Sequence, residues 1–239
     1  MKILAIDSSG LVASVAVVTE GAMLAEYTVN YKKTHSQTLL PMLDEIVKMI
    51  ELELSEIDAI AVAKGPGSFT GLRIGSATAK GLGLALEKPL IGVPTVDALA
   101  YNLCGTDRVI CPLMDARRNQ VYTGLYKFKD EKFTIIQEQT ATDIHEIIKQ
   151  INEIGQPVIY LGDGMDVYKE VLITETTVPY LFAPGHMNKQ RAGALGTLAL
   201  QYASEGRMES AAEHEPDYLR LSQAERELQE KQQAEEQGK

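Results

Sequence analysis

Two aspartates follow apolar segments that we expect to be strands, and they are the acids best placed to do chemistry. Asp7 ends the first such segment and precedes a Ser-Ser-Gly turn, and Asp115 follows a similar segment in the second half of the chain. Open α/β sheets bind ligands beyond the carboxyl ends of their strands, so either carboxylate could hold a magnesium ion or a water beside a phosphate. We therefore take Asp7, Ser8 and Asp115 as the candidate vicinity of a nucleotide. The alternative is a turn in which each carboxylate accepts hydrogen bonds from the backbone that follows it, and for Asp7 alone this alternative is favoured.

No other group of side chains has the spacing of a catalytic or metal site. The histidines are scattered, without the i, i+4 spacing that places two ligands on one helical face, and the cysteines lack zinc-site spacing and are expected to be buried thiols. There is no G-x-S-x-G elbow, so Ser68 is better explained as a helix cap than as a nucleophile. An adenosine could lie at the glycine turn 161–164, although Asp163 would repel a phosphate there. Arg117 and Arg118 either hold an anion or are solvated. The histidines and cysteines are His35, His145, His186, His214, Cys104 and Cys111.

The segment 57–87 predicts a buried strand, a tight turn and a helix that contains several glycines. The turn begins the pattern G-x-G-x-x-x-G, which is one residue too long for the dinucleotide fingerprint, so phosphate binding at this turn is not favoured. Four glycines inside a helix cost roughly 3 to 4 kcal/mol relative to alanine, so something must approach too closely for a Cβ to fit. Packing on the chain's own sheet is the favoured explanation, and a partner helix is the alternative. These glycines are Gly71, Gly75, Gly81 and Gly83.

Alternating apolar segments and helical periodicity predict a two-lobed α/β protein. Residues 1–103 contain three strands and a helix, followed by two strand–helix units, which is typical of a mixed sheet with helices packed on it. The order of three strands, helix, strand and helix recurs after Arg108, so we expect two related lobes. We place the first lobe at 1–105, the second at 106–221, and an acidic tail, frayed or disordered, at 222–239.

The negative charge of the chain makes it a poor binder of nucleic acid on its own. The 239 residues include 23 Lys and Arg against 33 Asp and Glu, which gives a net charge of −10. Affinity for nucleic acid depends on neutralising phosphates, so if RNA is the substrate we expect a partner to hold it. The N-terminal segment has one lysine and only a short apolar run, too little for a signal peptide or a membrane span. The cytoplasm is therefore the expected location, with no membrane partner.

Several segments together resemble one family. They are DSSGLVASVAVV (7–18), THSQTLLPML (34–43), the strand, turn and helix at 61–86 with its GPGSFTGLRIG run, KPLIGVPTVDALA (88–100) and DARRNQVY (115–122). Over residues 1 to 220 the chain resembles the TsaB family, also called YeaZ. The resemblance implies the two-lobed actin-like ATPase (ASKHA) fold, each lobe a mixed sheet of βββαβα order. It also implies a non-catalytic subunit in the bacterial synthesis of threonylcarbamoyladenosine beside the anticodon, at position 37, of tRNAs that read ANN codons.

The resemblance further implies partners. Proteins of this family pair with the catalytic subunit TsaD through helices of the first lobe, and the ATPase TsaE joins the pair. The tRNA is then bound only through the complex, and ATP or ADP is expected at an interface of the complex rather than as this chain's own cofactor. Because close helix packing needs small side chains, we predict a docking surface of two helical stripes, which a homodimer could share. The stripes are Leu39, Leu43, Ile46 and Ile50, and Leu72, Gly75, Ala79, Leu82 and Leu86.

Comparison with the catalytic relative, TsaD, implies that this chain lacks a pair of metal-binding histidines. TsaD carries a His-x-x-x-His metal pair after the corresponding glycine-bearing helix, and these histidines fall at Thr95 and Leu99 of this chain. Threonine and leucine offer no imidazole nitrogen, so the resemblance implies neither a metal site nor catalysis. The older description of the wider group as glycoprotease-like is thereby put in doubt for this chain.

Two other functions stay open. An ATP-dependent phosphotransferase of the actin-like class would use Asp7 and Asp115, and the isolated chain would turn over ATP with magnesium. An inactive, homodimeric, glycoprotease-like scaffold would have no connection with tRNA, and deleting its gene would leave the tRNA adenosine modified.

Overall fold

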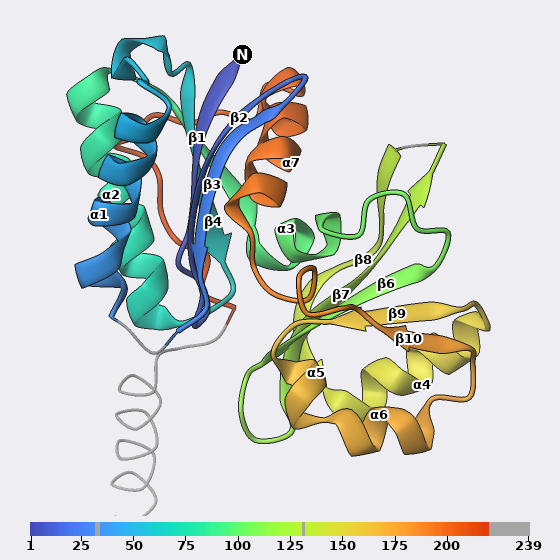
Figure 1. The fold of residues 1–239 in the computed structure, drawn as a ribbon. Coiled ribbons are helices and arrows are strands. Elements are labelled where there is room, and N and C mark those ends of the chain that lie inside the picture. Colours follow the sequence, from blue (N-terminus) through green and yellow to red (C-terminus); the bar gives the residue numbers. More distant parts are fainter. Residues whose placement is uncertain (32–33, 131, 220–239) are drawn as a thin grey trace, which may run out of the picture.

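The computed structural model describes residues 1–31, 34–130 and 132–219, which form two lobes, each built on a five-stranded mixed sheet (Figure 1). The first sheet has the spatial order β3-β2-β1-β4-β5, with β2 antiparallel to β1 and β3, and β4 parallel to β1 and β5. Its strands are β1 (Lys2–Asp7), β2 (Ala13–Thr19), β3 (Met23–Val29), β4 (Ala59–Gly65) and β5 (Leu90–Pro94).

The second sheet repeats the topology of the first. Its order is β10-β9-β6-β7-β8, so three antiparallel strands are again followed by two parallel ones when the strands are counted from β6. The repeat confirms the prediction of two related lobes. Only the short edge strand β10 was not predicted, because three residues show too little periodicity. The strands are β6 (Val109–Asp115), β7 (Gln120–Lys129), β8 (Lys132–Asp143), β9 (Val158–Leu161) and β10 (Tyr180–Phe182).

Helices cover both faces of the first sheet. On one face lie α1 (His35–Met49) and α2 (Phe69–Leu86), joined through the short 3-10 helix η1 (Leu54–Glu56) and β4. On the other face lie α3 (Thr95–Tyr101) and α7 (Ala192–Ser204). The central strands β1 and β4 are buried on both sides, as a sheet covered on both faces requires, whereas the edge strand β3 is exposed or half-buried. Within the described ranges, no helix is both long and apolar enough to cross a membrane.

The last helix corrects the predicted domain boundary. Helix α7 was assigned to the second lobe, but it packs on β1 and β2 of the first, where Leu195 and Leu198 are fully buried with Ile3 and Ala5. Its Gly196 lies against the sheet so closely that an added Cβ would be 2.9 Å from the Cβ of Ala5. The seven-residue α3 is too short to cover that face alone, so the chain returns to complete it. The assignment of 106–221 to one lobe is therefore wrong after residue 191.

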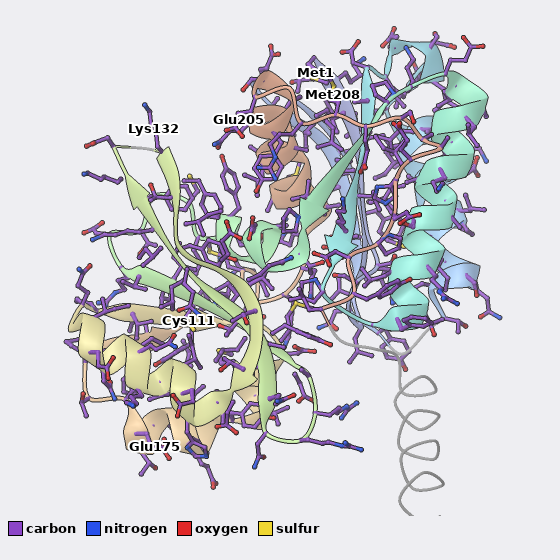
Figure 2. All side chains as sticks on the ribbon, turned by 180° about the vertical axis from the view of Figure 1, so that it is seen from behind. Met1, Cys111, Lys132, Glu175, Glu205 and Met208 are labelled. Atoms are coloured by element: carbon purple, nitrogen blue, oxygen red, sulfur yellow. The ribbon has the colours of Figure 1, made fainter. Side chains whose placement is uncertain are left out.

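The second lobe has its own helical layer. Its helices are α4 (Ile144–Ile154), α5 (Gly164–Val167) and α6 (Lys169–Glu175). The carboxylate of Asp143 caps α4 by accepting a hydrogen bond from the N–H of His145 at 2.9 Å. Cys111 of β6 is buried in this core, as predicted (Figure 2). Cys104 is exposed, contrary to prediction, because it lies in the turn after α3 rather than in the helix.

After α7 the chain runs back along the first lobe as far as residue 219. Glu209 exchanges two backbone hydrogen bonds of 2.9 Å with Leu90 of β5, and the N–H of Asp217 donates to the carbonyl of Lys64 at 2.7 Å. The ammonium of Lys80 in α2 donates to the carbonyls of Ala212 and His214. The predicted tail, 222–239, lies outside the described residues.

Helix α3 joins the two lobes. Its Leu99 packs with residues of β6 and β7 in a core shared by both lobes. Its Asp97 is buried and accepts hydrogen bonds from the hydroxyl of Tyr126 on β7, at 2.7 Å, and from the hydroxyl of Tyr202 on α7, at 2.9 Å. Burial raises the pKa of Asp97, although the two hydroxyl donors act to lower it. One carboxylate therefore ties the second lobe to the helical layer of the first.

Candidate functional site

The glycines of α2 pack against the turn between β1 and β2. A Cβ at Gly67 or Gly71 would collide with the backbone carbonyl oxygens of Ser9 and Ser8, and one at Gly75 would lie 2.5 Å from Ser8 Oγ. The turn is bonded to the helix as well, since Ser8 Oγ donates to the carbonyl of Gly71 at 2.9 Å. The close approach at Gly71 and Gly75 therefore comes from the chain itself, as the favoured explanation for these two glycines required.

The start of α2 follows the sequence prediction. Ser68 is the N-cap, and its hydroxyl accepts a hydrogen bond from the N–H of Gly71. The N–H of Ser68 in turn donates to the carbonyl of Ser9 at 2.7 Å. Ser68 thus has the structural role that the sequence favoured over that of a nucleophile.

The predicted docking stripes are mostly core, which corrects their assignment to a surface. Six of the nine residues are buried in the first lobe, namely Leu39, Leu43, Ile46, Leu72, Gly75 and Ala79. Ile50, Leu82 and Leu86 are half-buried, and the first two pack against the same core. A spacing of three and four residues shows that one face of a helix is covered, but it does not distinguish the chain's own sheet from a partner. The prediction that these nine side chains form the docking surface is therefore wrong.

The opposite face of the same helices carries apolar groups on the surface. Leu84 of α2 is 62% exposed and Leu40 of α1 is 57% exposed. Ala77 and Gly81 are also exposed, and with Leu84 they occupy positions i, i+4 and i+7 of one helical row. An added Cβ at Gly81 would meet no atom within 4 Å, so no contact inside this chain explains that glycine. In the sequence, Gly81 was included among the glycines that lower helix stability, but the docking surface was predicted only from the longer apolar stripe.

A cleft of about 550 Å³ lies between the lobes. The first lobe contributes Gly10, His35 and residues 67–70 at the start of α2, and the second contributes residues 114–117 and Asp163. Asp7 and Ser8 are buried and do not line it. The carboxylate of Asp7 accepts hydrogen bonds from the N–H and the hydroxyl of Ser9, which is the turn considered as its alternative role. Burial raises the pKa of Asp7 above its usual value.

Asp115 does line the cleft, together with a second acid. Its Oδ1 accepts from the N–H of Arg117 at 2.9 Å and from the hydroxyl of Tyr168 at 3.4 Å. Asp163 Oδ1 accepts from the N–H of Asp115 at 3.1 Å, and burial raises the pKa of Asp163. The two carboxylates oppose the approach of a polyphosphate to this wall, and Arg117, the cation beside them in the cleft lining, lies 3.4 Å from Asp115. Asp7, Ser8 and Asp115 as a nucleotide vicinity stay a prediction.

The turn between β6 and β7 forms the rim of this cleft and has an unusual backbone. Arg117, Arg118 and Asn119 all adopt the left-handed region, with φ of 66°, 55° and 58°. Non-glycine residues pay about 1–2 kcal/mol each for this conformation, less for asparagine. The turn is nevertheless pinned, because the N–H of Ala116 donates to the carbonyl of Gln120 at 2.9 Å and the carbonyl of Asn119 accepts from the N–H of Ile144 at 3.0 Å.

Comparison with known proteins identifies the family. The family model described as TsaD, tRNA N6-adenosine threonylcarbamoyltransferase, matches residues 22–228. The tRNA threonylcarbamoyladenosine biosynthesis protein TsaB of Bacillus subtilis is 33% identical, over 94% of this chain and 96% of its own length. The protein of the same name in Escherichia coli is 31% identical over 92% of this chain and 95% of its own length. This chain belongs to the TsaB family.

Solved structures agree with this family assignment. The YeaZ structure from Pseudomonas aeruginosa superposes with a TM-score of 0.77 at 28% identity, covering 91% of this chain and 99% of that one. A second Pseudomonas aeruginosa structure, described as an uncharacterized protein with similarity to peptidase YEAZ, gives 0.79 at 28% identity, with coverages of 92% and 99%. This chain therefore shares the fold of the YeaZ structures, with the two predicted α/β lobes, each built on a mixed sheet.

In this TsaB chain, the two positions at which the resemblance places the catalytic relative's metal ligands are internal. Thr95 and Leu99 lie one turn apart on α3, and both are buried. Leu99 belongs to the core shared by the lobes, and the Thr95 hydroxyl has no hydrogen-bond partner among the described residues. Neither side chain carries a nitrogen that could bind a metal.

One structural relative is described as similar to a peptidase, so a group of side chains arranged as in a hydrolase must be tested for access to a substrate. Sequence reasoning missed one: His214 Nδ1 lies 2.7 Å from Glu209 Oε1, and its Nε2 lies 2.7 Å from Ser76 Oγ. This Ser-His-Glu order resembles a nucleophile with its base. However, His214 is fully buried, Ser76 is buried within α2, and neither lines the interlobe cleft. A substrate has no access to this serine, and the three groups fasten residues 209–214 to α2.

Proposed function

We propose that this chain is the non-catalytic subunit that pairs with TsaD and, with TsaE, supports transfer of threonylcarbamoyl to adenosine 37 of tRNAs reading ANN codons, in the cytoplasm. The observation that carries the proposal is the match to TsaB proteins of tRNA threonylcarbamoyladenosine biosynthesis over more than nine-tenths of the chain. The chain's own residues favour a supporting role, since Thr95 and Leu99 cannot replace histidine ligands.

We place the docking surface for TsaD on the exposed row of α2, in place of the buried stripes. In the row Ala77, Gly81 and Leu84, the two small residues leave room for the backbone of a partner helix to approach closely. A second copy of this chain would use the same face and compete with TsaD. A nucleotide is better placed at an interface of the complex than in this chain's cleft, whose wall carries Asp115 and Asp163.

Reconstitution tests the function. ATP, bicarbonate, threonine and tRNA are incubated with the cognate TsaC-type enzyme, TsaD and TsaE, with and without this protein, and modified adenosine is measured. We expect product only when this protein and TsaD are both present. Equal product without this protein would refute the proposal. Magnesium-dependent ATP turnover by the isolated chain would instead favour a phosphotransferase.

A substitution at Gly81 tests the docking surface. Gly81→Leu places a bulky side chain where this chain has open space, so the fold stays intact while a partner helix is held away. We expect co-purification with TsaD to be lost, with the monomer still folded by circular dichroism. The matched control is Gly185→Leu, which adds the same side chain at an exposed glycine that also has no atom within 4 Å. Full pairing by the Gly81 variant would exclude this face.

A further inference from the structure

The pinned turn between β6 and β7 presents two guanidinium groups to solvent. The Arg117 side chain is 88% exposed, and its Nη1 lies 3.4 Å from Asp115 Oδ2. Arg118 is also exposed and makes no hydrogen bond or ion pair with any residue in the described ranges. The backbone at both positions adopts the left-handed conformation, which glycine would adopt without strain. The turn therefore displays charge at positions where the backbone alone would favour glycine.

The location of the turn relates it to the proposed docking face. Across the interlobe cleft, Ala116 and Arg117 face Ser68 and Thr70 at the N-terminal end of α2. Figure 1 shows the β6–β7 turn on the same side of the molecule as α1 and α2, below their lower ends. The exposed row of α2 begins about 10 Å further along that helix, at a rise of about 1.5 Å per residue, so a partner seated on the row reaches these arginines if it also extends along α2 to its N-terminal end.

The chemistry of the turn favours phosphate as its ligand. A guanidinium is always charged, and its planar fork matches phosphate oxygens. A nucleotide bound deeper in the cleft would meet the carboxylates of Asp115 and Asp163, whereas phosphates of a nucleic-acid backbone outside the cleft would meet the two arginines first. Since the chain carries a net charge of −10, such a contact contributes only when a partner also holds the nucleic acid.

We propose that Arg117 and Arg118 contact backbone phosphates of the RNA substrate while this chain is bound to its partner. This inference rests on the proposed function. The contact carries no sequence information, and it fixes how the RNA lies across the two subunits. Each phosphate neutralised by an arginine releases counterions, so the contact has a measurable dependence on salt.

The test compares tRNA binding by the assembled complex at several salt concentrations. With the double variant Arg117→Gln and Arg118→Gln, we expect the slope of log K against log salt to become shallower by about 1.4–1.8, at roughly 0.7–0.9 per phosphate. Affinity at low salt should fall on the order of tenfold. The charge-matched control is Lys129→Gln with Lys132→Gln, at the β7–β8 hairpin on the opposite end of the second lobe (Figure 2), and we expect it to leave the slope unchanged.

A second variant separates loss of charge from loss of folding. Arg118→Gly removes one guanidinium and also relieves the left-handed strain, so we expect weaker tRNA binding together with an unchanged or higher melting temperature. An unchanged slope in the double variant would overturn the inference, as would weaker assembly with TsaD, which would indicate a partner carboxylate instead. If the wild-type chain does not support modification at all, the proposed function fails rather than this contact.

Discussion

Two alanine substitutions in the same helix should change stability in opposite directions. Gly75→Ala places a Cβ 2.5 Å from Ser8 Oγ, whereas Gly81→Ala places one in open space. Both variants gain about 1 kcal/mol of helix propensity, so that gain cancels when they are compared. At position 75 the serine hydroxyl must move away from its 2.9 Å bond to the Gly71 carbonyl, which costs about 1–3 kcal/mol. Overpacking adds about 1–3 kcal/mol. The variants should differ by about 2–6 kcal/mol, with Gly81→Ala the more stable.

Urea unfolding, followed by circular dichroism, measures this difference. The chain has no tryptophan, so tyrosine fluorescence supplies the second probe of cooperativity. Adding Ser8→Ala to Gly75→Ala removes the colliding oxygen and should recover part of the loss, which assigns the cost to that contact. Equal stabilisation by both glycine substitutions would refute the packing argument for α2.

The buried carboxylate of Asp97 leads to two further predictions. Burial raises the pKa of Asp97 in the folded state, so the folded chain binds this proton more tightly than the unfolded chain does. The protonated carboxyl therefore contributes to stability at low pH. This contribution is lost as the pH rises from 3.8, the usual pKa, through the raised pKa. Asp97→Asn should therefore lose less stability than wild type between about pH 4 and pH 7, by urea midpoint, and identical pH profiles would contradict this. Tyr202→Phe removes a donor 2.9 Å from Asp97 Oδ2 and leaves a buried acceptor unsatisfied, which should cost about 1–3 kcal/mol by urea unfolding; no loss would show that the hydroxyl is dispensable.

Most of the secondary structure and the repeat of the lobes could be predicted from the sequence. Strands such as β4 and helices such as α1 carry periodic apolar side chains that report a covered face locally, and turns such as 65–68 use residues with special backbone freedom. The specific run GPGSFTGLRIG also carries the family resemblance, which supplied the functional expectation. These features depend only on residues near one another in the chain.

The surface available to a partner could not be predicted in the same way. The apolar stripe from Leu72 to Ala79 and the exposed row from Ala77 to Leu84 lie on one helix, and their spacing alone does not say which is covered. The covering element at Gly75 is Ser8, which is distant in sequence. Only the tertiary structure brings the two together, and so only it separates core from docking face.

The sequence by itself therefore determined the elements, their order and the two-lobed fold class, because periodicity and turn chemistry are local properties. The tertiary structure decided that α7 crosses to the first lobe, since that sheet has a second apolar face that α3 leaves uncovered. It also decided that Asp97 meets Tyr126 and Tyr202, and that Arg117 stands opposite the start of α2. Contacts between distant segments depend on the packing of the whole chain, and no local pattern encodes them.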